Sequence, residues 1–163
     1  MNLEHIQQLP HHVTVTIPEE YRDIFDHMNF QYYLKIFNDG VFDMFDGVGM
    51  TESYFLDNQV AMYAVDQRLN FKSEVKINDT VSIYSRLIAR SSKSLHFMQF
   101  MVNDTQHKVA ATLEGLGFHV SQETKRSAPF LDNIVAEIDA RLAEDHALEW
   151  DVLLSQAIQV SKK

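Results

Sequence analysis

The sequence predicts an α+β fold in which helices pack against an antiparallel sheet. Residues 29–46 carry apolar side chains at the i, i+3, i+4 and i+7 positions of a helix. Between residues 59 and 120, apolar segments rich in strand-forming residues are separated by the short polar turns KIND, RSSK and NDTQ. A chain of 163 residues is the size of one domain and can bury a large core.

The first predicted element is a strand over residues 12–17, because HHVTVTI alternates and is rich in β-branched residues. Pro18 ends it, and a loop over residues 19–28 follows. The helix over 29–46 is apolar on nearly every side, so we expect a sheet and a partner to enclose it. Gly40 inside this helix costs about 1 kcal/mol relative to alanine. A close approach of the helix backbone to the sheet would compensate.

Four strands are predicted next, over residues 59–73, 80–90, 94–104 and 107–120. Gly115 and Gly117 share one face of the last strand, and we expect the buried helix to fill the room that they leave. A polar connection leads to an acidic, solvated helix over 131–157. The predicted organisation is a main domain over residues 1–130 and a helical extension, 131–163, packed on it.

The composition excludes several classes of function. A net charge of −9 disfavours a nucleic-acid partner. The absence of cysteine excludes disulfides, thiolate nucleophiles and cysteine-based zinc sites, and it fits a reducing, cytoplasmic location. The N-terminal MNLEHIQQLPHH lacks the pattern of a signal peptide, and no apolar run approaches the length of a membrane span.

Asp23, Asp26 and His27 form a polar cluster where the chain enters the apolar helix. A helix start presents unpaired backbone N–H groups and the positive end of the helix dipole. Such donors can bind the developing oxyanion of an acyl transfer, while a nearby carboxylate acts as a nucleophile or as a base toward water. The alternative is structural: Asp26 or Asn29 could be an N-cap and His27 a hydrogen-bonded structural histidine.

The pattern D-x-x-x-H-M-N-x-x-Y-Y-x-x-x-F, which begins at Asp23 and ends at Phe37, resembles the signature of hotdog-fold acyl-CoA thioesterases. It is similar to the 4-hydroxybenzoyl-CoA thioesterase branch, and within it to the betainyl-CoA thioesterases of carnitine breakdown. The resemblance includes AATLEGLGFHV and KRSAPF and covers roughly residues 12–130. It implies a long central helix wrapped by a five-stranded antiparallel sheet, with the C-terminal helix outside the match.

The resemblance also assigns roles. It makes Asp23 the nucleophile or general base, and it makes the backbone N–H of Phe30 the group that polarises the thioester carbonyl. His27 and Asn29 would shape the loop and contact substrate. The family usually has glycine where this chain has Asp26. We expect that carboxylate either to raise the pKa of Asp23 by like-charge repulsion or to point into solvent.

Coenzyme A carries phosphates, so an acidic protein needs local positive charge to bind it. By resemblance, the phosphates would be held by basic residues near the second hairpin and after the last strand, namely Arg90, Lys93, Lys125 and Arg126. The acyl group would lie beside Tyr32, Tyr33 and Phe37, which could hold a quaternary ammonium by cation–π attraction or could simply be core. Asp43 or Glu114 could add charge.

These observations predict a thioesterase that hydrolyses a short or polar acyl-CoA, such as betainyl-CoA, to the free acid and coenzyme A. We expect a homodimer or a dimer of dimers, with no metal and no cofactor other than the coenzyme A of substrate and product. A non-catalytic acyl-CoA-binding protein on the same fold is the alternative. A hotdog dehydratase is the third possibility, but its helix histidine belongs to a different motif.

Overall fold

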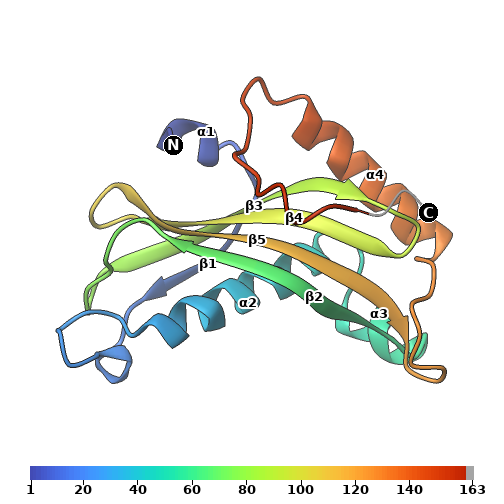
Figure 1. Cartoon of the computed structure of the whole chain (residues 1–163), viewed down its shortest axis with the longest axis horizontal. Coiled ribbons are helices and arrows are strands. Elements are labelled where there is room, and N and C mark those ends of the chain that lie inside the picture. The colour runs from blue at the N-terminus through green and yellow to red at the C-terminus, as the bar shows by residue number, and fades with distance from the viewer. Residues whose placement is uncertain (161–163) are drawn as a thin grey trace. The chain divides into compact units, whose positions relative to one another are not determined.

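The computed structural model describes residues 1–160 and forms a five-stranded antiparallel sheet with helices (Figure 1). The strands lie in the order β1-β3-β4-β5-β2, and β1 pairs with β3 through Thr14↔Ser82 and Thr16↔Thr80. The elements are α1 Leu3–Ile6, β1 His11–Thr16, η1 Glu19–Tyr21, α2 Phe30–Asp46, α3 Glu52–Asp57, β2 Val60–Phe71, β3 Thr80–Arg90, β4 Ser94–Asn103, β5 Lys108–Ser121 and α4 Asp132–His146.

The predicted fold class is confirmed, and each predicted strand and the long helix occur within a few residues of the expected bounds. The short helices α1 and α3 were not predicted, because four and six residues are too few to show a helical period. The prediction of a last helix over 131–157 was wrong at its C-terminal end, since α4 stops at His146. Within residues 1–160, no helix combines the length and apolarity needed to cross a membrane.

The chain forms two compact units. Unit 1 comprises residues 1–43, 69–86 and 99–113. Its core is built where Ile36 and Phe37 of α2 pack among buried residues of the sheet, including Val81, Ile83, Met101, Ala111 and Leu113. Burying one such large side chain contributes about 1.5–3 kcal/mol. This burial explains why the helix is apolar on more than one face.

Gly40 confirms the expected close approach of helix to sheet in unit 1. A Cβ atom added at Gly40 would lie 2.6 Å from Cγ2 of Ile83 and 3.1 Å from Nε2 of Gln99. Gln99 is fully buried, and neither polar atom of its side chain has a hydrogen-bond partner among the described residues. Glycine is therefore retained inside the helix for packing.

Unit 2 comprises residues 44–68, 87–98 and 114 onward. In it α4 buries Ile134, Ile138 and Leu142, and it is tied to β3 by polar bonds. The Leu87 amide donates to Asp145 Oδ2 at 2.8 Å, and His146 Nε2 lies 2.9 Å from the Ile88 carbonyl.

The room beside the two glycines of β5 is filled differently from the prediction. A Cβ at Gly115 would lie 2.5 Å from the ring of Phe97, and one at Gly117 would lie 3.0 Å from the methyl group of Met62. Side chains of neighbouring strands, and not the central helix, therefore occupy that space.

The segment after α4, up to residue 160, is irregular and not helical. Leu153, which falls within the helix predicted over residues 131–157, is 90 % exposed, whereas Ile158 is buried. The backbone N–H of Ser155 donates to Glu114 Oε2 at 2.8 Å. This bond ties the segment to β5, so the apolar spacing of residues 148–153 belongs to an irregular chain.

Candidate active site

The loop before α2 is held at several backbone points in unit 1. The Asp23 amide donates to the His27 carbonyl at 2.8 Å, which closes the loop on itself. The Met28 amide donates to the Val75 carbonyl, and the Asn29 amide donates to the Tyr21 carbonyl, both at 2.8 Å. The backbone thus fixes the loop at both of its ends.

Asp23 lies inside this loop with one carboxylate oxygen engaged. Its Oδ1 accepts from the His27 amide at 3.1 Å and from the Phe25 amide at 2.8 Å. The His27 amide, and then the Phe25 amide and the nearby His27 ring, hold the pKa of Asp23 below its ordinary value against partial desolvation. The carboxylate is therefore ionised at neutral pH. Its Oδ2 has no hydrogen-bond partner among residues 1–160.

Asp26 stands at the position where the family usually has glycine, and the backbone explains the usual choice. Its φ is +69°, in the left-handed region that glycine enters freely and that aspartate tolerates better than most residues. The Asp26 carboxylate forms an ion pair with Arg22. Of the two alternatives for Asp26, a raised pKa of Asp23 is not found, because that pKa is lowered and Asp26 is not among its causes. The Asp26 side chain is instead largely exposed to solvent.

Asn29 is the N-cap of α2, as one of the structural alternatives predicted. Its Oδ1 accepts from the Gln31 amide at 3.2 Å, and its carbonyl accepts from the Tyr32 amide at 3.0 Å. The first helical residue, Phe30, has no intrahelical acceptor for its N–H. No other acceptor for this amide exists in the described part of the chain. One free donor therefore marks the helix start.

His27 is held by an acidic neighbour. Its Nε2 lies 3.1 Å from Glu74 Oε2, and about a third of its side chain is exposed. His27 is bonded to Asp23 through its backbone: its amide donates to Asp23 Oδ1, and its carbonyl accepts from the Asp23 amide. This arrangement makes His27 a positioning residue for the loop.

A cleft of about 500 Å³ opens beside this loop and is lined by Arg22, Asp23, Ile24, Phe25 and Asn29. The side chains of Ile24 and Phe25 are 92 % and 71 % exposed, and Phe30 is 72 % exposed. An ionised carboxylate thus lies in an open cleft with exposed apolar side chains around it.

The three aromatic residues predicted to bind the acyl group have different environments. Phe37 is fully buried in the core of unit 1. Tyr33 is also buried, and its ring packs edge-on against Phe71 with the ring centroids 5.0 Å apart. Burial raises the pKa of Tyr33. Tyr32 is half-buried and stacks on Tyr21 at 3.7 Å. Of the three, Tyr32 alone has a substantially accessible side chain, and the substrate contacts stay a prediction.

Unit 2 brings the predicted coenzyme-binding residues to the end of β5. The His119 amide donates to the Lys93 carbonyl at 2.7 Å, and Val120 bridges to Ser127, just after Lys125 and Arg126. Lys93 and Arg126 have no side-chain partner within the described residues. Lys125 donates to Gln122 Oε1 at 2.9 Å.

Three charged groups that we expected near the coenzyme or the acyl group are paired with other side chains. The Arg90 guanidinium makes two 2.5 Å bonds to Asp139, which neutralises its charge. Asp43 lies 2.8 Å from His12 Nδ1. Glu114 pairs with His96 at 3.0 Å, in a buried contact that the sequence reasoning missed. The available signal was the single acidic residue, Glu114, in a strand of mostly apolar residues.

Comparison with known proteins identifies the family of this chain. Residues 18–138 match the thioesterase-like superfamily. The chain is 27 % identical over 140 residues to a betainyl-CoA thioesterase of Pseudomonas aeruginosa, covering 86 % of this chain and 87 % of that protein.

Solved structures show the same fold. A hypothetical protein from Staphylococcus aureus, characterised in complex with CoA, matches with a TM-score of 0.80 and 17 % identity over 94 % of this chain and 96 % of that chain. A 1,4-dihydroxy-2-naphthoyl-CoA thioesterase from Synechocystis matches with a TM-score of 0.70 and 9 % identity over 79 % and 95 % of the two chains. The chain belongs to the thioesterase-like superfamily and is a thioester hydrolase with the hotdog fold.

Proposed function

We propose that this protein hydrolyses acyl-CoA thioesters in the cleft at Asp23. One observation carries the proposal: an ionised carboxylate with a free Oδ2 and a free N–H at Phe30 both belong to the short loop and helix start around this cleft. A carboxylate and a positioned amide donor are the two groups that an acyl transfer requires.

The proposed chemistry follows from these groups. The Phe30 amide donates to the thioester carbonyl and stabilises the negative charge that develops on its oxygen. Asp23 takes a proton from a water molecule, whose oxygen attacks the carbonyl carbon. The C–S bond then breaks, the acid is released, and the thiolate of coenzyme A receives the proton. In the nucleophilic variant, Asp23 attacks the carbonyl carbon, the C–S bond breaks to release the coenzyme A thiolate, and an anhydride between Asp23 and the acyl group remains. Water then hydrolyses this anhydride to the free acid and the Asp23 carboxylate, and the proton released neutralises the thiolate.

The proposed substrate is a short, polar acyl-CoA, with betainyl-CoA as the first candidate. The 27 % identical relative from Pseudomonas aeruginosa, which is a betainyl-CoA thioesterase, supports this choice. Tyr32, which stacks on the buried Tyr21, is the partly accessible aromatic side chain that we propose contacts a quaternary ammonium. Lys93 and Arg126 are the basic side chains proposed to hold the coenzyme phosphates, because Arg90 is already paired with Asp139.

We further propose a homodimer. Ile24, Phe25 and Phe30 form an exposed apolar group beside the cleft, and large exposed apolar surfaces of soluble proteins commonly mark interaction sites. A second copy covering this group would shield the cleft from bulk solvent. Sedimentation of the purified protein measures the assembly directly.

The test is a hydrolysis panel of betainyl-, 4-hydroxybenzoyl-, and short and medium aliphatic CoA thioesters. We expect Asp23→Asn to lower kcat by roughly 10²–10⁴-fold while leaving the fold intact, since asparagine Oδ1 can still accept the two loop amides. Asp26→Asn is the matched control. It makes the same chemical change three residues later and should leave kcat within about twofold, because Asp26 pairs with Arg22.

Two results would contradict the proposal. One is full activity of the Asp23→Asn variant on every thioester that the parent protein cleaves. The other is coenzyme A binding by calorimetry with turnover of none of the thioesters, which would favour a binding protein.

A further inference from the structure

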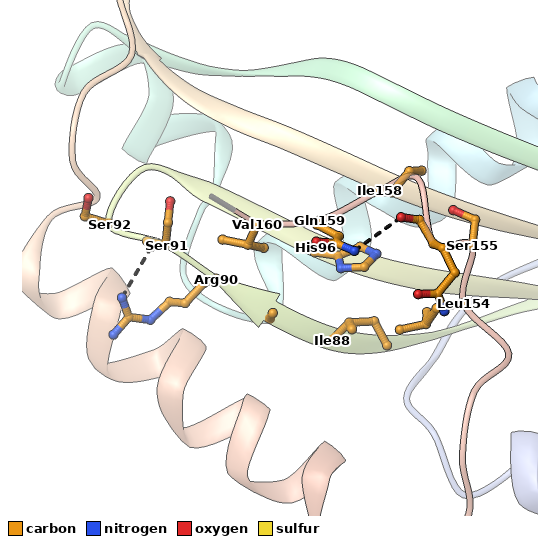
Figure 2. A pocket seen from close by; sticks show the side chains of 12 residues that line it. Ile88, Arg90, Ser91, Ser92, His96, Leu154, Ser155, Ile158, Gln159 and Val160 are labelled. Atoms are coloured by element: carbon orange, nitrogen blue, oxygen red, sulfur yellow. Dashed lines mark hydrogen bonds between the residues drawn. The ribbon is translucent and has the colours of Figure 1, made fainter. Parts of the chain in front are cut away.

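Three acidic residues are buried within residues 1–160, namely Asp79, Glu114 and Asp145. Two of them belong to unit 2. Glu114 pairs with His96, whose side chain lines a cavity of about 670 Å³ beside the segment after α4 (Figure 2). Asp145 pairs with an arginine of its own helix. Asp79 belongs to unit 1, as the Asp23 loop does, so it is the buried acid of the same compact unit.

Asp79 joins two turns of unit 1. It is the last residue of the connection between β2 and β3, and it is 7 % exposed. Its Oδ2 accepts from the Lys76 amide at 2.9 Å, within the same connection. The same oxygen accepts from Asn103 Nδ2 at 2.7 Å and from Gln106 Nε2 at 2.5 Å, at the end of β4 and in the turn that follows it. Burial raises the pKa of Asp79, but these three hydrogen bonds outweigh it and leave the pKa below its ordinary value.

The connection between β2 and β3 is bound to the loop before α2 at three successive residues. The Val75 carbonyl accepts from the Met28 amide at 2.8 Å. Lys76 pairs with His27 as an isolated antiparallel bridge, and Glu74 Oε2 lies 3.1 Å from His27 Nε2. The end of the loop is therefore held against this connection in the manner of a short extra strand.

His27 links this arrangement to Asp23. Its amide donates to Asp23 Oδ1 at 3.1 Å, and its carbonyl accepts the Asp23 amide at 2.8 Å. A series of contacts therefore leads from Asp79 through Lys76 and His27 to Asp23. A displacement of the His27 backbone would move the carboxylate, and a misplacement of about 1 Å at a reacting group can cost about 10² in rate.

Main-chain bonds hold the connection independently of the Asp79 side chain. The Ile17 amide donates to the Asp79 carbonyl at 2.8 Å, and the Asn78 amide donates to the Ile17 carbonyl at 2.9 Å. These bonds remain when the side chain is changed. We therefore expect loss of the carboxylate to displace residues 74–76 and to leave the sheet folded.

We propose that Asp79 is a positioning residue for Asp23: its carboxylate fixes residues 74–76 and, through them, the loop that aims Asp23 at the thioester. Asp79 is not among the residues that line the Asp23 cleft, so it acts through the loop and not on the substrate. The effect on catalysis rests on the proposed function of Asp23, whereas the effect on the Asp23 carboxylate does not.

The experiment compares the full-length parent protein with its Asp79→Ala variant. The pH titration of the Asp23 carboxyl carbon is followed by NMR, and the Asp23→Asn variant assigns its signal. The kcat, the KM and the pH profile of kcat/KM are measured with the thioester that the parent cleaves fastest, and urea unfolding measures stability.

Two further variants separate positioning from general stability. Asp79→Asn is the conservative variant, because its Oδ1 can take the place of Oδ2 and accept the same three donors. Asp104→Ala is the matched control. Asp104 lies in the same turn after β4, and its Oδ2 accepts from Ser82 Oγ at 2.7 Å. In the described part of the chain, Asp104 makes no hydrogen bond to residues 74–76.

We expect Asp79→Ala to raise the pKa of Asp23 toward the ordinary aspartate value, because the His27 amide is the largest contribution that lowers it. The acid limb of the kcat/KM profile should move to higher pH, and kcat should fall roughly 10–100-fold with KM within about twofold. Asp79→Asn should keep most of the activity, and Asp104→Ala should keep the Asp23 pKa and kcat of the parent. If Asp79→Ala does not fold, Gln106→Leu removes one of the three donors, with a smaller rise in the Asp23 pKa expected.

The inference is overturned if the folded Asp79→Ala variant keeps the Asp23 pKa of the parent, since Asp79 is then merely structural. It is equally overturned if Asp104→Ala raises that pKa as much as Asp79→Ala does. A raised Asp23 pKa with an unchanged kcat would support the positioning of the loop and contradict the proposed function of Asp23, so the two can fail separately.

Discussion

Replacing Phe30 by proline removes a single backbone N–H, the group that we propose polarises the thioester carbonyl. Phe30 is the first residue of α2, a position at which proline is favoured because its fixed φ suits the helix and its missing donor has no intrahelical partner. Asn29, the preceding residue, is the N-cap, and N-caps usually have the extended backbone that proline requires before it. The substitution is therefore local.

The expected changes in stability and in kcat follow from the groups that the Phe30→Pro substitution removes and from those that it keeps. The Phe30 side chain is 72 % exposed, so little burial is lost, and we expect the free energy of unfolding to change by less than about 1 kcal/mol. The Asn29 cap on Gln31 and Tyr32 remains. Removing one donor of an oxyanion site costs about 10²–10³ in kcat, or about 2.7–4 kcal/mol of transition-state stabilisation.

The assay measures kcat from thiol release at saturating thioester, with urea unfolding as the stability measurement. Phe30→Ala is the control, because it removes the same side chain and keeps the N–H. We expect the alanine variant to retain most of the activity and the proline variant to lose kcat with little change in KM. A folded proline variant as active as the alanine variant would refute the role of this amide.

Three further outcomes are expected. The lowered pKa of Asp23 keeps its carboxylate ionised on acidification, so kcat/KM should fall only once the pH is below the ordinary range of an aspartate carboxyl. The stability that Asp23 contributes is present above that range and is lost as the pH falls through the lowered pKa. An activity loss that is already complete above the ordinary aspartate range would argue against Asp23 as the base. Gly40→Ala gains about 1 kcal/mol of helix propensity, but it forces a Cβ atom against Ile83, which costs about 1–3 kcal/mol. Urea unfolding should therefore show that this variant is destabilised, whereas the control Gly47→Ala, at an exposed position, should not be. Equal stability of the two variants would contradict the close approach of helix to sheet. Gln99→Met removes a buried amide without partners and should raise the free energy of unfolding by about 1 kcal/mol, whereas a marked loss would reveal a bond to that amide.

The elements that the sequence predicted well are those with a long, regular period. The helix α2 begins at Phe30, one residue after the predicted start. The prediction was this accurate because apolar residues recur at helical spacing over four turns. The end of α4 was misplaced because apolar residues at 148–153 continue the helical spacing, whereas Ser155 is tied to Glu114 by a tertiary bond that local pattern cannot reveal.

At the candidate site, residue types could be predicted, but conformation could not. The motif located Asp23 and the helix start correctly in one loop. The left-handed backbone of Asp26 depends on how that loop closes, so its pairing with Arg22 could not be read from composition. The pair of His96 and Glu114 required the strand register, which brings together residues 18 positions apart.

In the loop around Asp23, the backbone and the side chains have separate roles. Two amides, at Phe25 and His27, orient the carboxylate, while the Ile24 and Phe25 side chains extend into open space. Substitutions at these two positions therefore change the side chains at the cleft and leave the two backbone amides that orient Asp23 in place. A substitution library limited to positions 24 and 25 would test whether these side chains set the acyl chain-length preference of the proposed site.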